Sequence, residues 1–335
     1  MEAAEFSDPP RTGTALKDWA NENPAWVAVG VLVLIAVILI IGEGLQPFAQ
    51  RSVNGIVSGS YFALGAIGLT LVYGILKLVN FAQGDMLTFG AYIAFLFDAT
   101  LDMPLAVALV AGVLATAALG LAQELAMWRP MRAKKAGMLQ LLLMALGLAF
   151  VLRYVIQFIW GTDPRSLDAD VTSSISFLGL SIGETELIVV IISFVVLTAV
   201  ATMLRVTSLG RQMRALADNF DLAETTGIDT GQVVLKTWLL AGGLAGLAGV
   251  LVVAATGSLS PNTGFYLLLP LFAAVVLGGI GNAYGALAGG LVIGLTQEWS
   301  TLIIESQWKV AVSFLVLIIV LIVRPQGIFG KERTL

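Results

Sequence analysis

The chain has 335 residues, of which 58% are hydrophobic and 12% are charged, with a net charge of −4 and a mean hydropathy of +0.93. Soluble domains carry about 25% charged residues, so this composition excludes a soluble globular protein and indicates a helical protein that crosses a membrane several times. The small net charge gives no basis for nucleic-acid binding. The absence of cysteine and histidine excludes disulfides, thiol nucleophiles, histidine bases and nearly every transition-metal site, so no metal is expected.

The sequence predicts ten membrane-spanning helices. The apolar segments are 25–41, 54–76, 84–98, 104–128, 138–160, 186–205, 233–254, 267–282, 284–303 and 308–323. Several approach the ~20 residues that cross the hydrocarbon core, whereas 84–98 and 267–282 are short. The predicted fold class is therefore an all-α polytopic membrane protein, with one transmembrane domain at 25–323, an N-terminal segment at 1–24 and a C-terminal tail at 324–335.

The positions of the positive charges predict the orientation. With ten spans both termini lie on one face, and that face receives 14 of the 18 lysines and arginines. The positive-inside rule makes it cytoplasmic. The chain is thus expected in the cell (plasma or inner) membrane with both termini in the cytoplasm. On the other face, the acidic loop 161–185 is expected to be solvated, with contact to an external partner as the alternative.

The stretch from Tyr73 to Tyr92 interrupts the apolar pattern. It holds Lys77, Asn80, Gln83 and Asp85, together with three glycines. Polar, flexible backbone at membrane depth is tolerated only where protein or a water-filled path surrounds it. The ten-span topology places Lys77 and Asp85 near the cytoplasmic side, where both are expected to be largely solvated. We therefore predict a hinge or inner gate here.

A second interruption runs from Gly278 to Gly294 and includes Asn282 and Tyr284. Paired, glycine-interrupted spans in the two halves point to a transport path. Close helix packing through small residues is the alternative. The residues expected to line the path are Asn80, Gln83, Gly84, Asn282 and Tyr284.

Two further ionisable residues lie within predicted spans, where a charge costs about 2.5–3.5 kcal/mol on insertion scales. Glu124 is expected to form a local ion pair with Arg129 or Arg132. Arg153 is expected to extend towards the outer headgroups, with attraction of an anionic substrate group as the alternative.

The sizeable cytoplasmic loop, residues 206–232, contains a predicted amphipathic helix from Arg211 to Thr225. Met213, Leu216 and Phe220 lie at helical spacing on it, and Gly227 is placed to cap its end. Such a helix either lies on the headgroups or docks into a groove of a partner; its mixed charges favour the groove. The sequence has no P-loop, so any ATP that drives this protein must be hydrolysed by another chain.

The motif Asn80-Phe81-Ala82-Gln83-Gly84-Asp85, followed by Gly90-Ala91-Tyr92, resembles the permease subunits of branched-chain amino acid ABC importers of the "NFAHGD…GAY" type. Gly210-Arg211, Arg214-Ala215, Gly227-Ile228, the Val276–Gly290 glycine run and Arg324-Pro325-Gln326-Gly327 continue the resemblance in the same order. Gln83 departs from the family's frequent histidine, and Asp221-Leu222 departs from its Glu-Ala.

This resemblance implies a ten-span permease of the cobalamin-importer (type II) architecture, without an ATPase site or bound cofactor of its own. It implies a second similar permease, two ATP-binding cassette ATPases and an extracellular or periplasmic substrate-binding protein as partners. The inner loop would be the ATPase coupling helix, with Arg211, Arg214, Asp218, Asp221, Ala223, Glu224, Gly227 and Ile228 as its residues. The cargo would be branched-chain amino acids. The alternatives are a related permease for urea, short amides or another small solute, and an ion-coupled secondary transporter acting alone.

Overall fold

The computed structural model describes residues 24–168, 173–177, 179–324 and 326–328. Nearly all of the predicted N-terminal segment and most of the C-terminal tail lie outside these residues. The first half of the chain forms α2 (Pro24–Glu43), α3 (Leu45–Leu76), α4 (Gln83–Phe95), the π-helical turn η1 (Leu96–Thr100), α5 (Leu105–Gln123), the π-helical turn η2 (Glu124–Trp128), α6 (Arg129–Ala133) and α7 (Met138–Trp160). The hairpin strands β1 (Ser174–Phe177) and β2 (Leu180–Gly183) follow. The second half forms α8 (Glu184–Val206), α9 (Ser208–Asp218), α10 (Phe220–Thr225), α11 (Thr230–Thr256), α12 (Thr263–Gly278), α13 (Ala283–Ser300), the 3-10 turn η3 (Ser306–Trp308) and α14 (Lys309–Val323).

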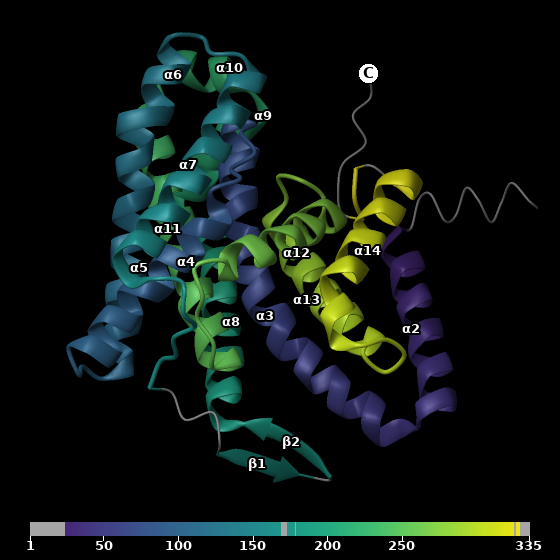
Figure 1. The fold of residues 1–335 in the computed structure, drawn as a ribbon. Coiled ribbons are helices and arrows are strands. Elements are labelled where there is room, and N and C mark those ends of the chain that lie inside the picture. The colour runs from purple at the N-terminus through teal and green to yellow at the C-terminus, as the bar shows by residue number, and fades with distance from the viewer. Residues whose placement is uncertain (1–23, 169–172, 178, 325, 329–335) are drawn as a thin grey trace, which may run out of the picture.

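Helix α3 is the centre of the bundle and runs diagonally through it (Figure 1). It packs against α13 and α11, while α4, α5 and α7 lie on one side and α12 and α14 on the other. Helices α6, α9 and α10 gather at one end of the molecule, and the β1–β2 hairpin extends from the opposite end. The described part of the chain therefore has two distinct ends, as a membrane-spanning bundle requires.

Every predicted apolar segment falls largely or wholly within a helix of the structure. Among the described residues, seven helices are long and apolar enough to cross a membrane: 26–43, 45–76, 105–133, 138–160, 184–206, 230–256 and 306–323. The chain is thus a mostly helical multi-pass membrane protein, as predicted. Helices α4 and α12, with 13 and 16 residues, are shorter than the ~20 residues of a full span, so the count of ten spans stays a prediction.

The outer loop departs from the all-α prediction, because it contains an antiparallel hairpin. Ser174 pairs with Gly183 and Phe177 with Leu180, and Gly179 has a positive φ of 79° in the turn. The sequence of 174–183 alternates serine with apolar residues, which is the pattern of a strand. The hairpin is fixed to α3, since Gln50 both donates to the carbonyl oxygen of Ser181 (2.7 Å) and accepts from its N–H (2.8 Å).

The glycines of the second interruption serve close packing. Helix α3 carries Gly55 and Gly59, and α13 carries Gly290 and Gly294, so both present a glycine every fourth residue. A Cβ atom on Gly294 would lie only 2.3 Å from the backbone nitrogen of Gly59. Small residues at this spacing let membrane helices approach backbone to backbone. The packing alternative therefore accounts for the glycines at this crossing.

Candidate functional site

The chain between α3 and α4 is not helical. Helix α3 ends at Leu76, and Lys77 follows in the left-handed conformation, with φ 53°. Asn80 then organises the return into α4, because its side-chain oxygen accepts from the N–H of Ala82 (3.1 Å) and its amide donates to Gln83 (3.3 Å). Asn80 and Gln83 are fully buried. The polar centre of this stretch therefore lies inside the protein.

Asp85, in the first turn of α4, forms an ion pair with Arg153 of α7. Arg153 Nε donates to Asp85 Oδ1 at 2.9 Å, and its Nη2 donates to Oδ2 at 3.1 Å. Only 1% of the Asp85 side chain and 10% of the Arg153 side chain are exposed. The prediction that Asp85 is largely solvated is therefore wrong, and so is the prediction that Arg153 extends towards the outer headgroups.

This ion pair lies well inside the bundle. Helix α7 begins at Met138, close to α6, and ends at Trp160. At 1.5 Å per residue, Arg153 is roughly 10 Å from the Trp160 end and roughly 22 Å from the Met138 end. The reason for the error is geometric. The chain does not continue as a helix after α3, and the non-helical segment 77–82 leads back into the bundle, where α4 begins.

The first turns of α4 and α12 meet at Gly84 and Gly264. A Cβ atom on Gly264 would lie 1.7 Å from the carbonyl oxygen of Gly84, and one on Gly84 would lie 2.2 Å from that of Gly264. Thr88 accepts a hydrogen bond from the N–H of Gly264 at 2.8 Å. Each half of the chain thus contributes a short helix that begins inside the protein after a non-helical segment. This arrangement is typical of transport paths.

Two phenylalanine rings, each in contact with a tyrosine, lie beside the Arg153 guanidinium. Its carbon lies 4.3 Å from the ring centroid of Phe265 and 5.6 Å from that of Phe150, distances at which a cation and an aromatic face attract each other. Phe150 stacks on Tyr154, and Phe265 contacts Tyr266. We call these four residues the aromatic patch. About half or more of each is exposed, so exposed aromatic surface lies next to the buried ion pair.

The two remaining predicted path residues lie elsewhere, at the start of α13. The side-chain oxygen of Asn282 accepts from the N–H groups of Tyr284 (3.1 Å) and Gly285 (3.2 Å), which caps the helix. The Tyr284 hydroxyl donates to the carbonyl oxygen of Ala201 in α8 at 2.9 Å. The structure therefore brings Asn80, Gln83 and Gly84 together at the start of α4, whereas Asn282 caps α13 and Tyr284 bonds to α8.

Sequence reasoning missed the contribution of α12 to this site. Gly264, Phe265 and Thr88 were not among the expected residues. A signal was present, because Ser-Pro-Asn-Thr-Gly at 260–264 is a turn cluster inside an apolar region, the kind of pattern that marks a helix boundary.

The predicted local ion pair of Glu124 is confirmed. Glu124 begins the π-helical turn η2, and both its carboxylate oxygens accept from Arg132, one turn beyond that element. This pair lies near the end of the helix. No group of three or more acidic side chains that could hold a metal ion occurs in the described part of the chain.

The inner loop forms two short helices where one was predicted. Asn219 is extended, with φ −154°, and separates α9 from α10, whose first turn it caps by accepting from the N–H of Leu222 (3.0 Å). Gly227, with φ 86°, ends α10 as predicted. Ile228 N–H bonds to the Ala223 carbonyl and Gly227 N–H to that of Glu224, which is the Schellman arrangement.

The apolar face of these helices is covered by the chain itself. Met213, Leu216 and Ala223 are buried, and α9 packs against α8, α3 and α11. Docking of these helices into a partner's groove stays a prediction, and it would use their outward face. Arg211 and Arg214 donate to carbonyl oxygens in the last turn of α8, those of Val206 and Leu204.

The outward surface of α9 and α10 is charged. Its exposed residues include Arg211, Arg214, Asp218, Asp221, Leu222 and Glu224, and Gly227 (exposed) and Ile228 (half-buried) follow α10. A partner at this end of the molecule would therefore meet a polar surface with Leu222 as its apolar contact.

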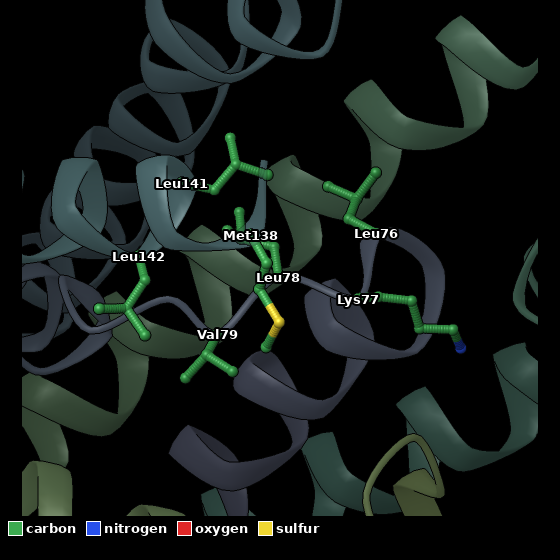
Figure 2. A pocket seen from close by; sticks show the side chains of 7 residues that line it. All are labelled: Leu76, Lys77, Leu78, Val79, Met138, Leu141 and Leu142. Carbon is green, nitrogen blue, oxygen red and sulfur yellow. The ribbon is translucent and has the colours of Figure 1, made fainter. Parts of the chain in front are cut away.

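A cleft of about 250 Å³ lies beside the non-helical segment, between the end of α3 and the first turns of α7. Leu76, Leu78, Val79, Met138, Leu141 and Leu142 line it, and Lys77 points away from these side chains (Figure 2). Its lining is apolar, so it does not suit a charged ligand.

Comparison with known proteins identifies the kind of protein to which this geometry belongs. The model of the family "branched-chain amino acid transport system / permease component" matches residues 51–321. The chain is 33% identical to the high-affinity branched-chain amino acid transport system permease protein LivH of Salmonella typhimurium over 305 residues, which cover 87% of this chain and 98% of the relative. It is 31% identical to the permease protein BraD of Pseudomonas aeruginosa, covering 86% and 98%. It is 27% identical to the ribose import permease protein RbsC of Escherichia coli K12, covering 92% and 94%. No solved structure gives a significant match.

Proposed function

The chain belongs to the family of permease components of branched-chain amino acid transport systems, and we propose that it is the membrane subunit of an ATP-driven importer. In this proposal it forms the translocation path, and partner chains bind and hydrolyse ATP. The observation that carries the proposal is the pair of interrupted helices, α4 and α12, whose first turns meet inside the bundle at Gly84 and Gly264.

The proposed architecture has ten spans in the type II arrangement, with both termini in the cytoplasm. Two observations support it. Helix α2 starts, and α14 finishes, towards the end of the molecule that carries α6, α9 and α10, opposite the hairpin (Figure 1). Short helices such as α4 and α12 complete a crossing when a non-helical segment adds to their length, which is tolerated where protein surrounds the backbone.

The ATPases would dock on the charged surface of α9 and α10. Lys77 supports this assignment, because its ammonium donates to the carbonyl oxygen of Gly74 (2.6 Å) in α3 and to that of Ala217 (3.3 Å) in α9. A displacement of α9 would thus reach the segment that precedes Asn80, Gln83 and Gly84. Rocking of these elements would open the path alternately to the two sides.

The partners follow from the same proposal. They are two ATP-binding cassette ATPases on the cytoplasmic side, a second similar permease in the bilayer, and a substrate-binding protein on the outer side. The hairpin and the loop that carries it give the outer end of the molecule a projecting element for that protein. The chain itself would bind no cofactor.

Branched-chain amino acids are the proposed cargo, because the relatives named for their transport match at 31–33% identity. A relative named for ribose import matches at 27%, so another small solute is the second candidate. An ion-coupled transporter acting alone would need a carboxylate inside the bundle, and Asp85 meets that condition. The experiment must therefore also distinguish ATP-driven import from ion-coupled transport by the single chain.

The test is reconstitution of the chain in liposomes, alone and with its candidate permease partner, ATPases and binding protein. We expect leucine uptake that needs ATP and all partner chains, and that does not respond to an imposed proton or sodium gradient. Gradient-driven uptake by the single chain without ATP would contradict the proposal.

A further inference from the structure

We infer that the Asp85–Arg153 pair, beneath the aromatic patch, is the subsite that recognises the charged head group of an α-amino acid on its way through the path. The inference rests on the proposed function and names the side chains that would bind the transported amino acid. The carboxylate of the amino acid would bind the Arg153 guanidinium. Its ammonium group would bind the Asp85 carboxylate, and its apolar side chain would lie on the aromatic patch.

The pair matches a zwitterion in charge and geometry. Asp85 and Arg153 hold each other through two hydrogen bonds of 2.9 and 3.1 Å. Removing one partner of a buried ion pair leaves an uncompensated charge inside the protein, which is strongly destabilising. A zwitterion gives each of the two residues a new partner of the right sign, so both charges stay compensated. A plain amine or a plain carboxylate leaves one of them unpaired. The pair therefore selects for molecules that carry both groups.

Access to the pair is from the side of the aromatic patch. Arg153 retains one-tenth exposure while Asp85 is almost fully covered, so a ligand meets the guanidinium first. Phe150 and Tyr154 of α7 and Phe265 and Tyr266 of α12 are all about half exposed or more. They offer apolar surface next to the charges, as a branched aliphatic side chain requires.

The location of this pair sets it apart from the other ion pairs of the described residues. Glu124–Arg132 lies in the last turns of the α5–α6 helix, and Glu298 binds Lys309 and Arg51 near the end of α13. Such pairs at helix ends are close to the interface. Arg153 lies roughly 10 Å from the nearer end of α7. Ionisable residues at such a depth in a membrane span face protein or water and not lipid.

A purely structural role is the competing explanation, in which the pair only ties α4 to α7. The two roles differ in whether it matters which helix carries which charge. An ion pair that only connects α4 to α7 needs opposite charges on the two helices, whereas a binding subsite in this position needs the cation on α7 and the anion on α4. The exchange variant D85R/R153D therefore separates them.

We expect the fully reconstituted transporter with D85R/R153D to assemble with its partners in size-exclusion chromatography and to lose at least tenfold of its ATP-driven leucine uptake. The matched control is E124R/R132E, which exchanges a second ion pair of this chain, with a buried carboxylate and a partly exposed arginine, and should retain uptake. Uptake by D85R/R153D at the rate of the unaltered transporter would overturn the inference. If D85R/R153D does not assemble, the neutral pair D85N/R153Q takes its place with the same two outcomes.

A second measurement reads binding directly. The chain has no cysteine, so Y266C in the assembled transporter places one reactive thiol on the aromatic patch. We expect leucine to slow its modification by a charged methanethiosulfonate, and isocaproate or isoamylamine at the same concentration to have no effect. Equal protection by all three, or none by leucine, would overturn the inference. Failure of the proposed function would show differently, as absence of ATP-driven uptake in the unaltered transporter.

Discussion

The ammonium group of Lys77 lies 3.3 Å from the carbonyl oxygen of Ala217 and donates a hydrogen bond to it. This contact joins two segments that are far apart in the sequence, the left-handed residue at the end of α3 and the last turn of α9. Lys77 thus links the charged surface of α9 and α10 to the non-helical segment that leads to Asp85.

From this link we predict that K77N uncouples ATP hydrolysis from transport. Asparagine tolerates the left-handed conformation, so the turn should form, but its short side chain cannot reach Ala217. We expect leucine uptake per ATP hydrolysed to fall several-fold, measured in proteoliposomes. The control K77R keeps a long cationic donor and should stay close to the unaltered ratio. An unchanged ratio in K77N would remove Lys77 from the coupling route.

The outward charges of α10 lead to a second prediction. D221N/E224Q leaves the buried Ala223 and the cap at Gly227 in place, and removes two exposed negative charges. We expect weaker association with the ATPases, by several-fold in a pull-down of detergent-solubilised complex, with a matching loss of uptake.

The control for this experiment is D163N/E184Q, which removes the same number of charges at the opposite end of the molecule. It should bind the ATPases normally. If both double variants bind the ATPases as well as the unaltered chain does, docking does not use this surface.

The contact of Gly84 with Gly264 leads to a third prediction. A methyl group on either residue would collide with the backbone oxygen of the other, at 2.2 and 1.7 Å. Overpacking of this kind costs about 1–3 kcal/mol, so we expect G84A and G264A to lower the thermal unfolding temperature of the purified protein.

Gly147 of α7 is the control, because nothing lies within 4 Å of a Cβ atom built there. There the alanine variant should unfold at the same or a higher temperature, since alanine is favoured over glycine in helices by up to ~1 kcal/mol. Equal behaviour of G84A and G147A would contradict the close crossing of α4 and α12.

The ten-span topology gives a fourth prediction. Single cysteines introduced into this cysteine-free chain at Lys135 and Thr226 should react with an impermeant maleimide only after the cells are permeabilised. Cysteines at Asp163, Ser176 and Glu305 should react in intact cells. All five positions are exposed. Labelling of Glu305→Cys from the same side as Lys135→Cys would rule out ten spans.

Much of the site-bearing framework could be predicted from local sequence. The apolar segments, the cap at Gly227 and the Glu124–Arg132 pair all depend on residues within a few turns of one another, and spacing along a helix determines such contacts. The break at Asn80–Asp85 was equally visible, because polar residues and glycines interrupt an apolar run there. Its depth was not visible, since an apolar sequence such as Leu78-Val79 does not distinguish helix from extended chain.

The sequence by itself determined that this is a multi-pass helical membrane protein, where its helices lie, and to which family it is similar, because composition, periodicity and motifs are properties of neighbouring residues. Only the tertiary structure decided that Asp85 meets Arg153, 68 positions along the chain, and that Gly84 meets Gly264. These contacts depend on the path of the chain between helices, which sets the depth at which the next helix begins. Segment 77–82 is not helical, so α4 starts inside the bundle, where Asp85 reaches Arg153, and not at the expected cytoplasmic turn.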